Sequence, residues 1–121
     1  MADTAIVITW GTSFPGREAP SLALFMEVTQ WWEGKRAAGE VSDFRSYMAT
    51  TGSLSKHGGF MLIEGDAAKL DRVCESEEFR TFVVKGIHLL SGIEVNRFDT
   101  GPAIGKAVER VLGVRKQLGI G

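Results

Sequence analysis

The stretch TAIVITW, Thr4 to Trp10, decides the fold, because it is rich in β-branched residues and apolar on both of its alternating faces. Val7 falls on one face, and Ile6 and Ile8 fall on the other. A strand that is apolar on both faces belongs in the middle of a sheet. The run FMLIEG, Phe60 to Gly65, has the same continuous apolar character and predicts a second central strand.

Two other segments alternate between apolar and polar residues, as edge strands often do. In Glu40 to Thr50, Phe44 lies on one side and Arg45 and Tyr47 lie on the other. The segment Ile87 to Phe98, after a break at Gly86, predicts the last strand. The sequence therefore predicts four strands, two central and two at the edges.

Helical periodicity accounts for the segments between the strands. A helix is expected from about Arg17 to Gly39, and a second one is capped by Asp66 and starts again at Ser76. A terminal helix, about 102–118, has proline at its start. Its apolar residues fall on one side, and they are Ile104, Ala107, Val108, Val111, Leu112 and Leu118.

The element order is βαββαβ with an extra C-terminal helix. Two central and two alternating strands fit a four-stranded antiparallel sheet of order 4-1-3-2, which is the ferredoxin-like α+β fold. Right-handed crossovers place both helices on the same face of that sheet. We expect a single domain over residues 1–121, with a core from Thr4 to Phe98.

The other face of the predicted sheet has no helix to cover it. Because the central strands are apolar on both sides, that face carries more large side chains than a monomer normally exposes. We therefore expect a homodimer in which two sheets stack face to face as an α/β barrel with a cavity near its middle.

The composition limits the classes of partner and the cellular compartments that we expect for this protein. The chain has a formal charge of −1 and scattered basic residues, which argues against a nucleic-acid partner. It contains no apolar run of membrane-spanning length and no signal-peptide core at its start. The single cysteine, Cys74, suits a reducing compartment. We expect a cytoplasmic protein that does not associate with membranes.

The segment DAAKLDRVCESEEFRTFV, Asp66 to Val83, is a helix interrupted at a Ser-Glu-Glu-Phe step, and it precedes the strand-like GIEVNRF. In these segments and in the order of its elements from Thr4 to Phe98, the chain resembles the dimeric α/β-barrel superfamily. This superfamily includes YCII-related domains, small antibiotic-biosynthesis-type monooxygenases and stress-responsive barrel proteins. The resemblance implies a dimer and cofactor-independent proton transfer or oxygenation. The YCII histidine with its Asp-Pro partner and the Asn-Trp pair of haem-degrading members are not recognisable here, so no cofactor is carried over.

Four residues are candidates for binding a ligand in the expected cavity. Arg45 and Tyr47 share a strand face, where a guanidinium and a phenol can hold a carboxylate or phenolate. Trp10 and Phe14 can wall the pocket. The alternative for Arg45 is an ion pair, either with Asp43 or with Glu94 of the other subunit.

Two residues are candidates for proton transfer. His57 lies beside Gly58 and Gly59, which allow close approach of a ligand or a tight turn. Glu64 could be a base with a raised pKa in the cavity. The alternatives are a solvated loop histidine and a strand-end carboxylate in water. No metal site is expected, because no zinc motif is present and the histidines lack partners at ligand spacing.

Two functions follow. The first is binding of a small, partly apolar organic molecule, with or without turnover, and we expect a ligand site to show a void above about 300 Å³. The second is a non-catalytic interaction module that recognises its partner through the terminal helix and an exposed tryptophan, because Trp31 and Trp32 are expected not to face the same core.

Overall fold

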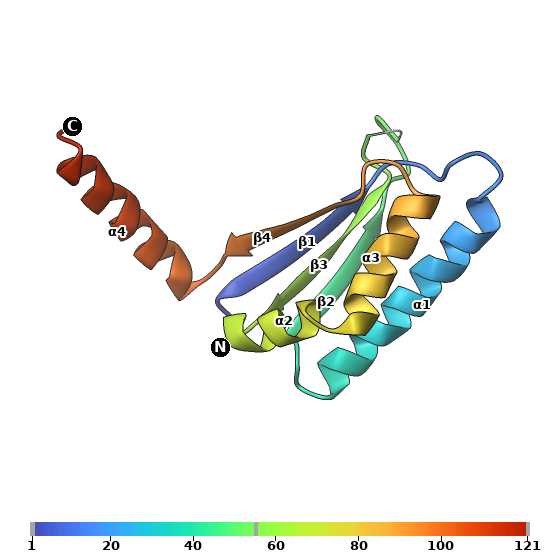
Figure 1. Ribbon diagram of the computed structural model, residues 1–121, viewed down its shortest axis with the longest axis horizontal. Coiled ribbons are helices and arrows are strands. Elements are labelled where there is room, and N and C mark those ends of the chain that lie inside the picture. Colours follow the sequence, from blue (N-terminus) through green and yellow to red (C-terminus); the bar gives the residue numbers. More distant parts are fainter. Residues whose placement is uncertain (1, 55, 121) are drawn as a thin grey trace.

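A computed structural model describes residues 2–54 and 56–120 of the chain (Figure 1). Its strands form one antiparallel sheet in the order β2-β3-β1-β4. This confirms the predicted ferredoxin-like α+β fold with strand order 4-1-3-2 and a C-terminal helix. In chain order, the elements are β1 (Thr4–Trp10), α1 (Glu18–Ala37), β2 (Asp43–Met48), β3 (Gly59–Gly65), α2 (Ala67–Cys74), α3 (Glu77–Leu89), β4 (Glu94–Asp99) and α4 (Pro102–Gln117).

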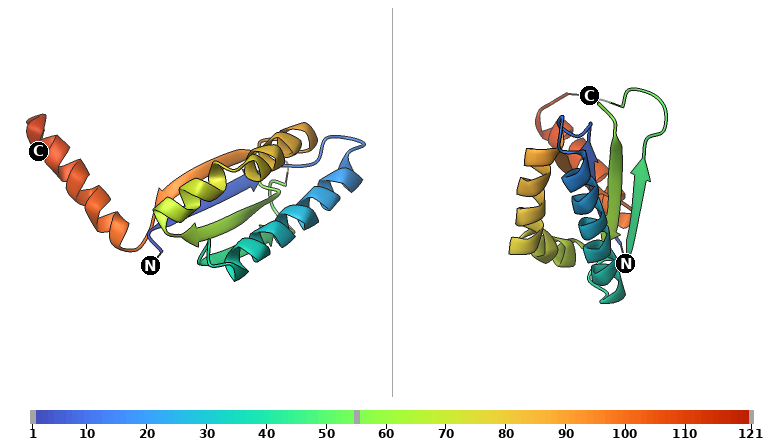
Figure 2. Two further views of the ribbon diagram at one scale, coloured as in Figure 1. Left: turned by 60° about the horizontal axis from the view of Figure 1, so that its bottom comes forward. Right: turned by 90° about the vertical axis from the view of Figure 1, so that its right-hand side faces the viewer.

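The sheet has two unlike faces. Helices α1, α2 and α3 all cover one of them, which we call the helix face (Figure 2). The other face, called the open face below, has none of these helices on it. The register places Ile6, Ile63 and Phe44 side by side on the helix face. The same register places Val7, Leu62, Arg45, Thr9, Phe60 and Tyr47 on the open face.

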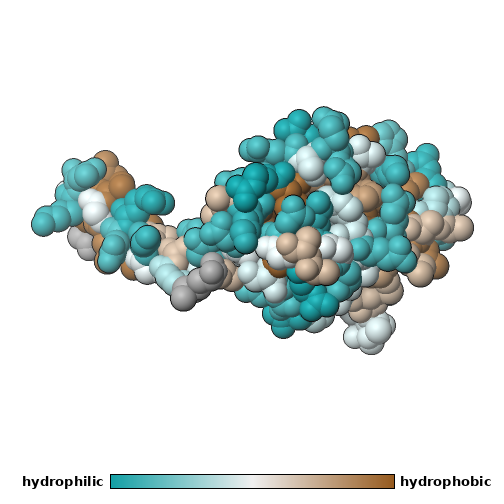
Figure 3. Space-filling view, turned by 90° about the horizontal axis from the view of Figure 1, so that it is seen from below, coloured by the Kyte–Doolittle hydropathy of each residue, from teal (hydrophilic) through white to brown (hydrophobic). Residues whose placement is uncertain are grey.

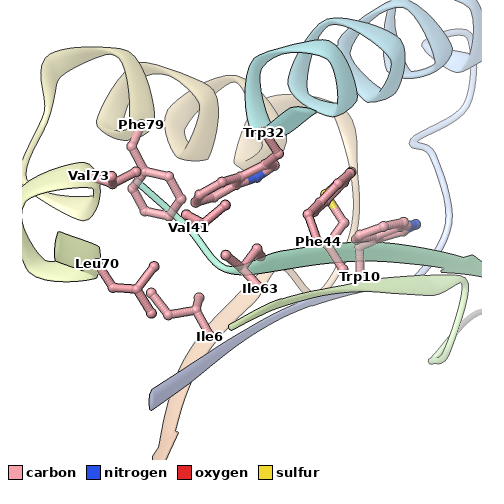
Figure 4. Packing of buried hydrophobic residues seen from close by; sticks show 10 residues of the cluster. Ile6, Trp10, Trp32, Val41, Phe44, Ile63, Leu70, Val73 and Phe79 are labelled. Atoms are coloured by element: carbon pink, nitrogen blue, oxygen red, sulfur yellow. The ribbon is translucent and has the colours of Figure 1, made fainter. Parts of the chain in front are cut away.

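The hydrophobic core lies between the helix face and the helices. Trp32, Ile63 and Leu70 are its largest fully buried side chains. The Trp32 ring reaches from α1 toward the sheet, between Phe79 and Phe44 (Figure 4). Its ring centroid lies 5.8 Å from that of Phe79 and 6.3 Å from that of Phe44. These contacts fasten α1 to α3 and to the edge strand.

Trp31 packs beside Trp32 and against the aromatic rings of α3. Trp31 is half-buried, and its ring centroid lies 4.8 Å from that of Trp32 and 5.3 Å from that of Phe82. Its indole Nε1–H donates to Glu78, 3.3 Å away. Adjacent helical positions can share one core here because α3 runs alongside α1 and receives the second ring.

The interruption between α2 and α3 is built as predicted. Asp66 precedes α2, and its carboxylate accepts a hydrogen bond from the Lys69 backbone N–H at 3.2 Å. Ser76 precedes α3, and its hydroxyl oxygen accepts one from the Phe79 N–H, also at 3.2 Å. Both caps satisfy backbone donors that a helix start leaves free.

The expected strand start at Ile87 was wrong. Helix α3 continues through Leu89, and β4 begins only at Glu94. His88 therefore lies in the last helical turn, where its ring Nδ1 donates to the Val84 carbonyl at 2.8 Å. Gly86 does not break the helix. It is buried, and a Cβ there would come within 3.2 Å of the Ile93 side chain, so its small size lets the next segment pack closely.

The two glycines after His57 have a packing reason. A Cβ on Gly58 would lie 1.6 Å from the carbonyl oxygen of Gly11, and one on Gly59 would lie 2.7 Å from the Trp10 ring. The Gly58 N–H also donates to the Trp10 carbonyl at 2.8 Å. Side chains are therefore excluded where this loop crosses the end of β1.

Candidate functional site

The best-formed recess in the described part of the chain is an apolar cavity of about 210 Å³ between α1, α3 and the helix face. We call it the helix-side cavity. It lies on the opposite side of the sheet from the cavity predicted within a dimer. Its lining comprises Ile8, Trp10, Ser13, Glu18, Ser21, Leu22, Leu24, Phe25, Val28, Met48, Met61, Phe79, Phe82, Val83, Gly86, Leu90 and Ile93.

The hydrophobic periodicity of the strands and helices explains which residues line this cavity. Alternation along β1 sends Ile8 and Trp10 to the helix face, where Met61 of β3 faces Ile8 across the ladder. Helical spacing on α3 brings Phe82 and Val83 to the same cavity as Phe79 and Gly86. The sheet forms the floor, and the two helices form the walls.

The cavity opens at a rim that carries one charge. Among its lining residues Glu18, Leu22 and Met48 are exposed, so these mark the opening. Glu18 is the only charged lining residue. Deeper in, the Ser21 hydroxyl donates to the Arg17 carbonyl at 2.7 Å, which satisfies it within the protein. The interior is thus apolar, and hydrogen bonding to a ligand is concentrated at the rim.

The structure does not bring all the predicted site residues together. Trp10 is buried on the helix face beside Phe44 (Figure 4). Arg45, Tyr47 and Glu64 lie on the open face instead. The alternation along β1 and the pairing through β3 put the sheet itself between Trp10 and this group.

Phe14 lies in the loop between β1 and α1 and does not line the helix-side cavity. It is 37% exposed, and the Arg17 guanidinium sits over its ring, 5.6 Å from the centroid. Its backbone N–H donates to the Leu89 carbonyl at 2.9 Å. Phe14 thus ties the loop to the end of α3.

Arg45 is already held by two carboxylates of its own chain. Its side chain lies 3.3 Å from Asp43 and 3.3 Å from Glu64. The pair with Asp43 is one of the alternatives that the sequence left open. Because the same guanidinium also pairs with Glu64, the three side chains of Arg45, Asp43 and Glu64 form an ion-pair cluster on the open face.

His57 and Tyr47 do lie near one another. Both line a hollow of about 390 Å³ at the end of β2 and β3, between the strands and the loop that joins them. Tyr47 stacks on Phe60 with ring centroids 4.6 Å apart. His57 is exposed, and its backbone N–H donates to the Ser53 carbonyl at 2.8 Å. This hollow is larger than the helix-side cavity, and half of its lining residues come from the loop between β2 and β3.

The Cys74 thiol and a metal site are the remaining candidates for chemistry. Burial raises the pKa of the Cys74 thiol to about 11, against a smaller opposing effect of Arg97. The thiol is therefore protonated at neutral pH and is a poor nucleophile. Within residues 2–54 and 56–120, no group of three or more histidine, cysteine and acidic residues is placed to hold a metal ion.

No protein-family model matches the chain, and no curated protein sequence matches it. Solved structures do share its fold. PA3566 from Pseudomonas aeruginosa superposes with a TM-score of 0.60 at 20% identity, over 84% of this chain and 96% of that one. HapK from Hahella chejuensis superposes with a TM-score of 0.52 at 15% identity, over 80% of this chain and 90% of that one. At these identities the likeness establishes the fold alone.

Proposed function

We propose that the protein binds a small, largely apolar organic molecule in the helix-side cavity. The observation that carries this proposal is an apolar recess that opens to solvent beside a single carboxylate. Small-molecule sites are usually concave and apolar, with few well-placed polar groups. A core with no binding role would normally fill such a space with side chains.

The size of the cavity limits the ligand. Its volume of about 210 Å³ is below the 300 Å³ that was expected of a ligand site, so only a small ligand fits. A buried apolar cavity of about 150 Å³ is enough to hold benzene. The ligand class that fits is a single ring or a short branched alkyl chain, rather than a haem or a flavin.

The charged residue at the rim of the cavity determines which polar group a ligand should carry. Glu18 accepts hydrogen bonds and carries negative charge, and it is the only charged residue in the lining. A ligand with a hydroxyl or an amine at one end can place its apolar part inside and its donor at Glu18. A carboxylate at that end would be repelled.

Binding is proposed here rather than turnover. His57 and Glu64, the predicted proton-transfer residues, do not line this cavity, and its lining contains neither histidine nor cysteine. For Arg45 to hold an anion on the open face, it would have to give up its contacts with Asp43 and Glu64. The geometry thus favours a binding protein whose selectivity comes from shape and from Glu18.

The test compares two phenylalanine substitutions on adjacent residues of α3. Val83 lines the cavity and is half-buried, whereas Val84 is 53% exposed and does not line it. Wild type, Val83→Phe and Val84→Phe are screened by thermal unfolding against one-ring phenols, alcohols and amines. At 100 times its Kd, a ligand stabilises the folded state by about 2.7 kcal/mol. For a chain of this size, that raises Tm by on the order of 10 °C.

The ligand shift should persist in Val84→Phe and be lost in Val83→Phe, because only the second fills the cavity with an extra ring. Far-ultraviolet circular dichroism without ligand confirms that both variants fold. A ligand shift of equal size in the two variants would place the ligand elsewhere. If no compound of the panel shifts wild type, the interaction module is the better account.

A further inference from the structure

Helix α4 stands away from the rest of the molecule (Figure 1). A connector of two residues, Thr100 and Gly101, separates it from β4. The Thr100 N–H donates to the Asp3 carbonyl at 2.9 Å, and Gly101 has φ +54° next to the Ala2 backbone. The connector is therefore short and anchored, and it directs α4 outward instead of back over its own sheet.

One side of α4 is apolar and uncovered. Its apolar residues recur at helical spacing and form a stripe that includes Arg115. Lys116 and Arg110 border this stripe, and Lys106 lies opposite it. None of the residues of α4 is buried, and brown surface is visible on this arm in Figure 3. The exposed members of the stripe are Ile104, Val108, Val111, Leu112, Val114 and Leu118.

The open face is a second uncovered apolar surface of the same chain. Phe98 is 52% exposed, and the stacked rings of Tyr47 and Phe60 are each about 40% exposed. Val7 and Leu62 lie between the two ends of this face. Single exposed apolar residues are common on proteins, but a contiguous group is not.

We propose that two copies of the chain exchange their terminal helices, so that α4 of each copy lies across the open face of the other. This goes beyond the proposed ligand site and does not depend on it. It differs from the sheet-on-sheet dimer expected from the sequence, because a helix, and not a second sheet, covers each open face. Each copy gives its α4 to the other and receives the other's α4 on its own open face. Because both copies make the same contact, the assembly closes as a symmetric dimer.

Charge favours this pairing. Helix α4 carries four basic residues and one acidic residue, Glu109. The open face carries three carboxylates, those of Asp43, Glu64 and Glu94, against the single guanidinium of Arg45. A basic helix on an acidic face gains complementary potential on docking.

Size favours it as well. A helix of 16 residues is about 24 Å long, close to the length of about 20–23 Å of strands of six or seven residues. One side of a stable interface usually contributes about 20–30 residues, more than α4 has. With exchange, each copy contributes both its helix and its open face.

The molar mass in solution, measured by light scattering on the full chain, tests this exchange. The stripe variant is Ile104→Gln with Val111→Gln, which replaces two exposed apolar residues of the stripe with glutamine, a good helix former. Its matched control is Glu109→Gln with Lys116→Gln, which changes two residues on the polar side of α4 and leaves the net charge unchanged. Phe60→Gln probes the receiving surface.

Wild type and the control should be dimeric, and the stripe variant and Phe60→Gln should have Kd values for dimerisation raised at least tenfold. A monomeric wild type overturns the proposal. So does a stripe variant that stays dimeric while Phe60→Gln dissociates, since that pattern indicates stacked sheets. If monomeric wild type sediments with phosphatidylserine vesicles, the stripe serves a lipid surface and the exchange is wrong.

Discussion

The choice of residue is most tightly restricted where two distant segments of the backbone pack closely together. The sequence predicted a turn at Gly58 and Gly59, but it could not reveal that the backbone of Gly11 and the ring of Trp10 occupy the space beside them. Such an approach between segments that are far apart in the chain depends on the register of the sheet. His57 lies in the same loop, directly before Gly58, and its backbone N–H donates to the Ser53 carbonyl.

Replacing Gly58 with alanine should destabilise the protein by about 3 kcal/mol or more, because the new Cβ would lie 1.6 Å from the carbonyl oxygen of Gly11. The matched control is Gly34→Ala in α1, where no atom lies within 4 Å of the new Cβ. That change should stabilise the helix by about 0.5–1 kcal/mol. Urea unfolding measures both, and equal stabilities of the two variants would contradict this packing.

Cys74 should react slowly with iodoacetamide while the protein is folded. Burial raises the thiol pKa from 9.0 to about 11, so at pH 8 the thiolate fraction falls about 100-fold relative to an unperturbed thiol. Because the folded state holds this proton more tightly, the stabilising contribution is complete below pH 9 and is lost as pH rises through 11.

Mass spectrometry of the alkylated protein follows the reaction at pH 8, with and without urea. The control is the same chain unfolded, which should react at the rate of a free thiol. A folded protein that is alkylated as fast as the unfolded one would show that the Cys74 side chain is open to solvent.

Elements were predicted from periodicity with mixed success. The apolar character of both faces of β1 and β3 identified the central strands, and the caps at Asp66 and Ser76 identified the interrupted helix. The end of α3 was missed because Gly86 was interpreted as a helix breaker. Its role is set by Ile93, which packs against it from a later segment, and such contacts leave no mark in the local pattern.

The break between α2 and α3 depends on one hydroxyl. Ser76 accepts a hydrogen bond from the Phe79 N–H and donates one to the Val73 carbonyl at 2.6 Å. Ser76→Ala should lower the free energy of unfolding by about 1 kcal/mol. Thr81→Ala, an exposed site within α3, should change it by less than about 0.5 kcal/mol. Urea unfolding of both variants checks this, and a neutral Ser76→Ala would show that the cap is dispensable.

At the scale of the whole molecule, the sheet separates two roles. Its helix face borders the helix-side cavity. Its open face carries an ion-pair cluster and exposed aromatic rings, and helices α1, α2 and α3 do not cover it. The sequence predicted that the open face would need a partner, and it placed a ligand there too. It could not reveal the cavity, because a gap between helices depends on how far side chains from separate elements fill the space.

No helix in the described ranges, 2–54 and 56–120, is long and apolar enough to cross a membrane. The apolar stripe of α4 is exposed, and the charge and length of this helix fit the proposed docking on a second copy. The two proposals can fail independently, since the proposed ligand and the proposed partner helix would lie on opposite faces of the sheet.

The most direct measurement is a methyl NMR titration of the protein with p-cresol, a single ring with one hydroxyl. Methyl groups report each face separately, with Ile8 and Val83 lining the helix-side cavity and Val7 and Leu62 on the open face. We predict saturable shifts for Ile8 and Val83, and none for Val7 and Leu62. Shifts confined to Val7 and Leu62, or no saturable shift of any methyl, would contradict a ligand site between the helices and the sheet.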